Sequence, residues 1–315
     1  MLTVLALAQR STSQELFRRS LALFTHPFMH RRELMAVFHR SFKWCCSLPS
    51  SRVARIPADI VDELLAAACM SPHAVGHLRW PIATELSCTD ATPTAGGSVR
   101  ATVQPPLAEA LYRMTEHRGC HVRLDSRQQQ HAEQLLPPDP LVAEVVACIP
   151  WQVGRSHEFP ETAHINLQEM REIVWELRDR VNRTLQPARV VNGVDSMVCL
   201  GAWAKGRSSS FMLNGILRRS IGVQVLGRKS LANYHLVSAD NPSDDPSRGQ
   251  KLRAPKAAPS WLTPLLKPGP TESAPERGPP RARRLCLECH AGCGQLSKAL
   301  ERAGLLVARP FEAFP

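Results

Sequence analysis

The chain has 315 residues, which is long enough for one sizeable hydrophobic core with tails or for two small domains. Its 39 Lys and Arg residues outnumber its 28 Asp and Glu residues, and the formal net charge of +11 favours a polyanionic partner such as nucleic acid. No apolar stretch approaches the ~18 residues that a membrane span requires, so we expect no membrane partner and an intracellular location, in the cytoplasm or nucleus. The alternative to a polyanionic partner is a merely soluble basic protein. For the location, the alternative is that the N-terminus is a transit peptide.

Helices and one strand pair are expected in the first half of the chain. Residues 14–46 predict one or two basic amphipathic helices, and residues 57–68 predict another, because apolar residues recur at helical spacing. The alternating pattern of residues 80–104 predicts two strands joined by a turn. Residues 106–116 are typical of a helix, whereas residues 122–140 are polar and irregular.

The second half alternates between strands and helices. Residues 141–153 predict a buried strand or a short helix. Helices are expected over 164–183, 196–204 and 211–225, and strands over 189–194 and 234–238. Asn166 is the expected cap of the first of these helices. Strands followed by helices, with parallel-type crossovers, predict an α/β layered domain across residues 80–250, preceded by a helical piece over residues 1–79.

Four acids lie where the predicted elements could use them for chemistry. Asp90 is on a predicted strand, where a buried carboxylate is costly unless it is paired or binds a cation. Glu169 lies at the edge of a buried helical stripe, Asp195 ends a strand, and Asp244 follows the last strand. Such a set could hold two Mg²⁺ or Mn²⁺ ions, which prefer oxygen ligands. The alternative is that each acid is separately a cap, a turn former or a surface charge.

At these positions the sequence resembles the ribonuclease H domain of reverse transcriptases from DIRS-like retroelements. The matching strings are TDATP at 89–93 with Gly96–Gly97, HINLQEMR at 164–171, Asp195–Ser196 with KGRSSS at 205–210, and NPSDDPSR at 241–248. The resemblance implies a mixed sheet with helices on both faces, and it implies that Asp90, Glu169, Asp195 and Asp244 are the catalytic metal ligands. It further implies an insertion over residues 107–140 and a thumb-like or connection-like remnant over residues 1–79.

The resemblance implies hydrolysis of the RNA strand of RNA–DNA hybrids. Six cations are candidates for binding phosphates: Lys205, Arg207, Arg218, Arg219, Arg228 and Lys229. The alternative is that they lie on a solvated helix face. No Tyr-x-Asp-Asp motif is present, so we do not expect the chain to be a polymerase on its own. The second hypothesis is a catalytically inactive relic that still binds nucleic acid.

The C-terminal region begins with prolines and ends with a separate pattern. Residues 251–284 predict a disordered linker that does not pack. The string CLECH at 286–290 matches a haem-attachment motif, and Cys293 adds a third thiol for a zinc site. A strand over 285–288, then Gly292–Gly294, then a helix over 295–303 resembles the first motif of S-adenosylmethionine-dependent methyltransferases. We expect residues 285–315 to be a truncated, inactive remnant, because only 21 residues follow Gly294, far fewer than a methyltransferase fold needs. Reduced intracellular thiols argue against haem.

Overall fold

The computed structural model describes residues 10–50, 52–117, 139–267, 285–286 and 306–307. The chain divides into two compact units, residues 1–269 and residues 270–315. In the second unit β8 (Leu285–Cys286) pairs in parallel with β9 (Leu306–Val307). The rest of the methyltransferase-like segment, including Cys289, His290 and the expected helix, lies outside the described residues. Residues 118–138, which contain most of the expected polar stretch, also lie outside the described residues.

The beginning of the first unit is helical, as the sequence predicts. Its elements are β1 (Ser11–Ser13), α2 (Gln14–Phe28), η1 (Arg32–Val37), α3 (Ser41–Ser47), β2 (Val53–Arg55), α4 (Ala58–Met70) and η2 (Ser71–His73). The Ser13 hydroxyl caps α2 by accepting from the backbone N of Leu16. The apolar run Leu34–Val37 is buried on all sides, which explains why the basic amphipathic pattern is interrupted by a 3-10 turn. The expected helices over 14–46 are therefore two α-helices separated by η1.

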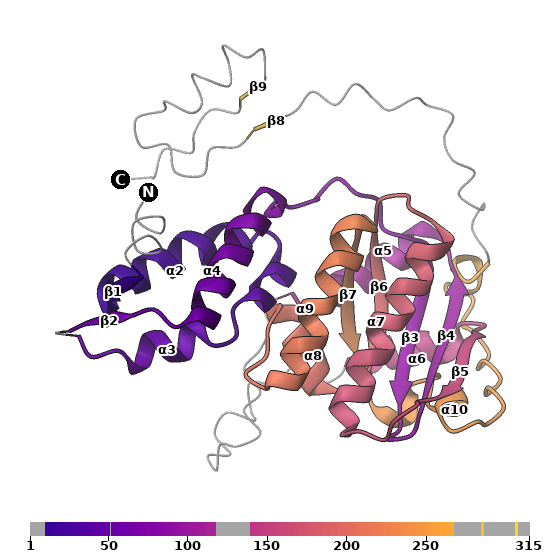
Figure 1. The fold of residues 1–315 in the computed structure, drawn as a ribbon. Helices are drawn as coiled ribbons and strands as arrows, with labels where there is room; N and C mark the ends of the chain where they lie inside the picture. The colour runs from indigo at the N-terminus through magenta and orange to yellow at the C-terminus, as the bar shows by residue number, and fades with distance from the viewer. Residues whose placement is uncertain (1–9, 51, 118–138, 268–284, 287–305, 308–315) are drawn as a thin grey trace. The chain divides into compact units, whose positions relative to one another are not determined.

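A mixed five-stranded sheet forms the centre of the first unit, with strand order β5-β4-β3-β6-β7 (Figure 1). Its strands are β3 (Glu85–Ala91), β4 (Ala95–Thr102), β5 (Gln152–Glu158), β6 (Ala188–Val194) and β7 (Lys229–His235). β3, β4 and β5 pair antiparallel, whereas β6 lies parallel to both β3 and β7. The carboxyl ends of β3, β6 and β7 therefore lie at the same edge of the sheet.

Helices cover both faces of this sheet (Figure 1). The remaining elements are α5 (Pro105–Arg113), α6 (Pro140–Cys148), α7 (Ile165–Arg183), α8 (Met197–Lys205), α9 (Phe211–Leu226), η4 (Ser238–Asp240), α10 (Asp244–Ser247) and η5 (Thr263–Leu265). One hydrophobic core joins α7, α8 and α9 to the N-terminal helices, and a second joins the opposite sheet face to α5 and α6. The expectation of an α/β layered domain with a mixed sheet and flanking helices is confirmed.

Three segments differ from the sequence-based expectations. The apolar residues 141–153 form α6 and then lead into an unexpected edge strand, β5, whose residues are mostly exposed and therefore lack an apolar alternation. The last strand begins at Lys229 rather than Tyr234. Residues 251–267 pack against the second core instead of forming a free linker, and Leu262 is 1% exposed. Prolines there rigidify an extended segment, but leucines between them supply the apolar contact.

No helix among the described residues is long and apolar enough to cross a lipid bilayer. Of the cysteines that the structure describes, Cys45, Cys88, Cys148 and Cys199 are buried free thiols, as expected from their apolar surroundings, whereas Cys46 and Cys69 are exposed.

Candidate functional site

Asp90 lies near the carboxyl end of β3 and is only 5% exposed. The Ser247 hydroxyl of α10 donates a hydrogen bond to its Oδ2 at 2.5 Å. Opposite Asp90 on β4 is Gly97, where a Cβ atom would collide with the backbone N of Ser247. Glycine at this position therefore allows α10 to approach the sheet closely enough to reach Asp90.

Glu169 is presented by the first turns of α7. The His164 side chain caps this helix by accepting from the backbone N of Asn166 at 3.3 Å, so His164 takes the capping role expected of Asn166. The Cys199 thiol lies 3.6 Å from Glu169 Oε2. Burial and the nearby charge of Asp195 raise the pKa of Glu169, while hydrogen bonds from Ser196 and Cys199 oppose this rise.

Asp195 directly follows β6, at the same sheet edge as Asp90 because β3 and β6 are parallel. The imidazole of His235, the last residue of β7, lies 3.3 Å from the Asp195 carbonyl oxygen. Burial lowers the pKa of His235, so this imidazole is neutral at physiological pH.

Asp244 and Asp245 begin α10 side by side, and their surroundings differ. Asp245 accepts two hydrogen bonds from the Arg253 guanidinium and one from its backbone N, all at 2.8 Å. Among the described residues, the Asp244 carboxylate pairs with the exposed side chain of Arg248, at 2.8 Å. The pKa of Arg248 is raised first by this bond and also by the charges of Asp90 and Asp195. Asp245 is therefore occupied by Arg253, whereas the assignment of Asp244 to a metal site stays a prediction.

The four acids share one electrostatic environment. The pKa of Asp90 is raised to about 7, chiefly by burial and also by the charges of Asp195, Asp244 and Glu169, whereas the Ser247 hydrogen bond opposes this rise. The other three acids therefore act electrostatically on Asp90. Within the described part of the chain, however, no three His, Cys, Asp or Glu side chains are close enough together to hold one metal ion.

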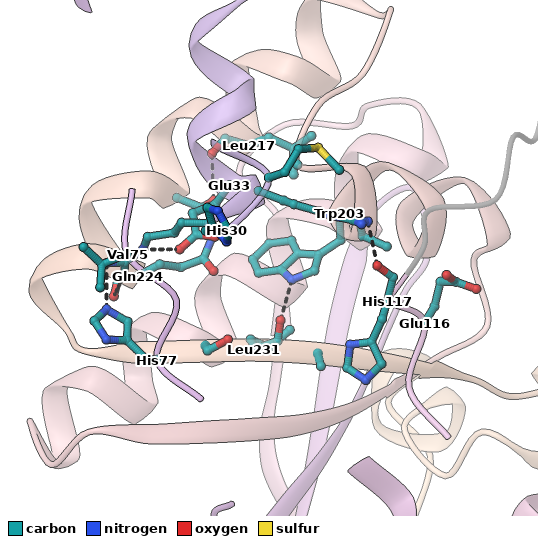
Figure 2. A pocket seen from close by; sticks show the side chains of 18 of the residues that line it. His30, Glu33, Val75, His77, Glu116, His117, Trp203, Leu217, Gln224 and Leu231 are labelled. Atoms are coloured by element: carbon teal, nitrogen blue, oxygen red, sulfur yellow. Dashed lines mark hydrogen bonds and ion pairs between the residues drawn. The ribbon is translucent and has the colours of Figure 1, made fainter. Parts of the chain in front are cut away.

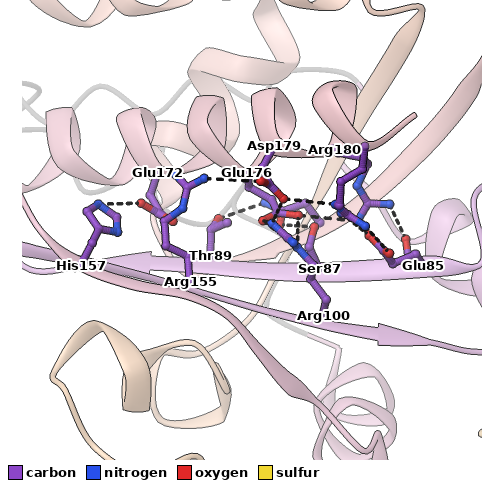
Figure 3. Close-up of polar contacts among 12 residues, drawn as sticks. Glu85, Ser87, Thr89, Arg100, Arg155, His157, Glu172, Glu176, Asp179 and Arg180 are labelled. Carbon is purple, nitrogen blue, oxygen red and sulfur yellow. Dashed lines mark hydrogen bonds and ion pairs between the residues drawn. The ribbon is translucent and has the colours of Figure 1, made fainter. Parts of the chain in front are cut away.

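A buried polar network fixes α7, and hence Glu169, on the sheet (Figure 3). Arg100 of β4 donates two short hydrogen bonds to Glu176, at 2.9 and 2.6 Å, and Arg180 donates to the Glu85 carbonyl at 2.7 Å. Glu176 and Arg180 lie on the same helical face, one turn apart, and both are buried. Because bidentate pairs have a fixed geometry, this network sets the rotation of α7 about its axis.

The six predicted phosphate-gripping cations do not share one surface. Arg218, Arg219 and Arg228 are exposed, and Lys205 and Arg207 are half-buried. Lys229 is 1% exposed, and its ammonium donates to the Thr184 carbonyl at 2.9 Å and to the Gln186 carbonyl. The assignment of Lys229 to nucleic-acid binding is therefore wrong, because the residue belongs to β7 and its charge is satisfied inside the fold.

A pocket of about 220 Å³ lies between the N-terminal helices, α8, α9 and β7, and none of the four acids lines it (Figure 2). Its arginines are engaged in joining these elements. Arg31 pairs with Glu33 at 2.7 Å and donates to the Gln224 carbonyl at 3.2 Å, and Arg32 donates to the carbonyls of His117 and Ala204. The pocket therefore lies where these arginines join elements of the fold, and it is not an extension of the acid cluster.

Three neighbours of the acids were not singled out from the sequence: Ser247, Ser196 and His235. Ser247 and Ser196 lie inside the strings that carry the resemblance, so their proximity to Asp90 and Glu169 could have been inferred from those strings. His235 has no such signal, because only the parallel pairing of β6 and β7 brings it beside Asp195.

Comparison of the chain with models of protein families, with curated proteins and with solved structures finds no match.

Proposed function

We propose that residues 80–250 form a ribonuclease H-like domain that hydrolyses the RNA strand of RNA–DNA hybrids with the help of two Mg²⁺ or Mn²⁺ ions. The observation that carries this proposal is that Asp90 and Asp195 lie at the same edge of the sheet, with Glu169 and Asp244 on helices that pack against β3. These acids come from β3, α7, the end of β6 and α10, and the other three all raise the pKa of Asp90. Gathering four carboxylates is unfavourable without cations to neutralise them.

The donor set fits such ions. Four carboxylates supply the hard oxygen ligands that Mg²⁺ and Mn²⁺ prefer. Mg²⁺ is usually held by one or two carboxylates together with water and substrate phosphates, so a cage of three protein ligands is not required. When bound, the pair of ions would lower the pKa of the attacking water and stabilise the leaving oxygen of a phosphodiester. Asp90, Glu169, Asp195 and Asp244 are the residues that would hold these ions.

The protein's own contribution is to hold the acids in place. Ser247 orients Asp90, Ser196 and Cys199 contact Glu169, and the polar network under α7 fixes the helix that carries it. These fixed partners limit the reorganisation that the site would need when substrate binds.

The proposal is tested by Mg²⁺-dependent cleavage of a hybrid whose RNA strand is labelled. We expect the wild-type protein to cut the hybrid but not duplex DNA. Replacing a direct ligand should reduce the rate at least ~100-fold, since even outer partners of metal ligands typically cost 10–100-fold, so Asp195→Asn and Asp244→Asn should be nearly inactive.

Asp245→Asn is the matched control, because it removes the neighbouring carboxylate, which pairs with Arg253 instead. We expect this variant to cleave the hybrid like the wild type. Equal, negligible cleavage by the wild type and by Asp195→Asn would contradict the proposed hydrolysis.

Binding of nucleic acid without cleavage is a second candidate function. It is favoured by the finding that, among the residues described, no three potential ligands lie within reach of one ion. The pairing of Asp244 with Arg248 points the same way, since it partly neutralises one of the acids. In this case hybrid binding should be equally tight for the wild type and for Asp195→Asn, and neither should cleave.

A further inference from the structure

An exposed aromatic side chain and several cations lie around His39, near the beginning of α3 and the beginning of α9. We call this surface the α3–α9 patch and define it by Phe42, Lys43, Arg207, Phe211 and Arg218. The Arg207 guanidinium lies 4.5 Å from the centre of the Phe42 ring. Phe211, the first residue of α9, is 66% exposed.

The patch is held rigidly by buried hydrogen bonds. Asn214, which is 1% exposed, donates to the Ala36 carbonyl at 2.8 Å and accepts from the backbone N of Ser208 at 3.0 Å. The His39 ring contacts Phe211 edge-on, with 5.3 Å between the ring centres. The beginning of α9, the loop before it and the end of η1 are therefore fixed relative to one another.

The beginning of α3 is fixed by one buried acid, Glu63. Its carboxylate accepts from the backbone N atoms of His39, Arg40 and Ser41, at 3.1, 2.9 and 2.9 Å. Because these bonds occupy Glu63, it does not pair with the cations of the patch. In the part of the chain that the structure describes, no acid forms an ion pair with Lys43, Arg207 or Arg218.

Along the direction of the sheet strands, the patch lies at the same height as the acid cluster. Only Gly227 and Arg228 separate α9 from β7, so the helix must run back antiparallel to the strand (Figure 1). Sixteen residues of helix and seven residues of strand both span roughly 23 Å, so Phe211 lies level with the carboxyl end of β7. That end carries His235, which contacts Asp195.

We propose that the α3–α9 patch binds a single-stranded nucleic-acid segment that continues from a hybrid seated at the acid cluster, with one base stacked on Phe211 and phosphates bound by Lys43 and Arg218. This inference rests on the proposed function for the location of the hybrid. Exposed aromatic rings beside unpaired cations are the surface that single strands recognise, because every base has a face that can stack. The excess of positive charge attracts the phosphates of the same strand.

The proposal is tested by fluorescence anisotropy without divalent metal, using a blunt labelled hybrid and the same hybrid with a single-stranded DNA or RNA extension of about ten nucleotides. We expect the extension to tighten binding about tenfold, the effect of stacking one base. Phe211→Ala should remove this gain while leaving the binding of the blunt hybrid unchanged. Lys43→Gln and Arg218→Gln should each reduce the salt dependence of binding to the extended hybrid by about one phosphate contact.

Leu226→Ala and Arg178→Gln are the matched controls, because they change an exposed apolar residue at the other end of α9 and an exposed cation of α7 that is not among the predicted phosphate-binding residues. We expect both variants to keep the full gain from the extension. An extension that adds no affinity, or a gain that survives in Phe211→Ala, would overturn the proposal. An acidic peptide that competes as well as single-stranded DNA would also overturn it, in favour of a protein partner.

Cleavage of the blunt hybrid, measured on the same proteins, separates this inference from the proposed function. If the wild type does not cleave but the extension still tightens binding through Phe211, the patch is supported and only the hydrolysis fails. If the blunt hybrid is cleaved but the extension has no effect, the patch alone is wrong.

Discussion

Glu172 and Glu176 lie one turn apart on the sheet-facing side of α7, and both are fully buried. Glu176 is bound by the Arg100 guanidinium, whereas neither carboxylate oxygen of Glu172 has a hydrogen-bond partner. The nearest ionisable neighbour of Glu172 is His157 of β5, with 3.5 Å between His157 Nε2 and Glu172 Oε2. Burial raises the pKa of Glu172 to about 8 and lowers the pKa of His157, so both side chains are uncharged at neutral pH.

Glu172→Gln should make the protein more stable at high pH. The folded-state pKa of about 8 lies above the unfolded value near 4.3, so the wild type loses up to about 1.4 kcal/mol per pH unit between these values. Glutamine cannot ionise, so we expect the variant to match the wild type at pH 5 and to exceed it by about 4 kcal/mol at pH 8.5, because the wild type loses stability over about three pH units. Urea unfolding at both pH values measures this difference. Glu176→Gln is the control and should instead lose stability, because it leaves Arg100 without its carboxylate.

Single residues also show how far the sequence could predict the site. Asp90, Glu169, Asp195 and Asp244 were predicted from short strings, and their role as metal ligands stays a prediction. The choice of Asp244 over Asp245 is compatible with the pairing of Asp245 to Arg253. Lys229 was misassigned, because a lysine is rarely buried and nothing local indicates that two backbone carbonyls receive its ammonium.

At the scale of elements, helices and strands were predicted correctly from the sequence where they bury a stripe of apolar residues. α7 was recognised over nearly its full length because its apolar residues recur with helical period. β5 was missed because it is an edge strand with mostly exposed residues, and only pairing with β4 makes it a strand. The break between α8 and α9 was expected from its polar residues, but its physical cause is Gly206, which adopts a φ of 71°.

Gly206→Ala should weaken the attachment of the N-terminal helices to α8. A Cβ atom at Gly206 would collide with the Arg32 carbonyl, and the left-handed backbone conformation adds a further penalty. We expect the free energy of unfolding to fall by more than 3 kcal/mol, in the range of large single-site effects. Gly249→Ala is the matched control, since Gly249 has a φ of 67° and nothing within 4 Å of the added atom. It should cost only about 1–2 kcal/mol, the price of the conformation alone; equal losses for both variants would contradict this explanation.

At the scale of the whole molecule, the N-terminal helices are not an independent remnant. Phe28, Leu34 and Phe38 are fully buried in the same core as Leu177 of α7 and Leu217 of α9. The sequence places a boundary near residue 79 because the periodic pattern changes there, but periodicity does not reveal what an apolar stripe packs against.

Deletion of residues 1–79 should therefore abolish cooperative unfolding of the rest, because it exposes the apolar faces of α7, α8 and α9. Deletion of residues 270–315, which form a separate unit, should leave the thermal midpoint of the first unit unchanged. Calorimetry on both truncated proteins measures this contrast. A sharp, unshifted transition after removal of residues 1–79 would contradict a shared core.

We expect the carboxylates of Asp90, Glu169, Asp195 and Asp244 to bind two divalent cations. Titration with Mn²⁺, followed by electron paramagnetic resonance of the free ion, counts the bound ions directly. We expect two ions per chain in the wild type and in Asp245→Asn, and weaker, incomplete binding in Asp90→Asn, which lacks the most buried of the proposed ligands. Binding that is absent from the wild type, or that is unchanged in Asp90→Asn, would contradict the account.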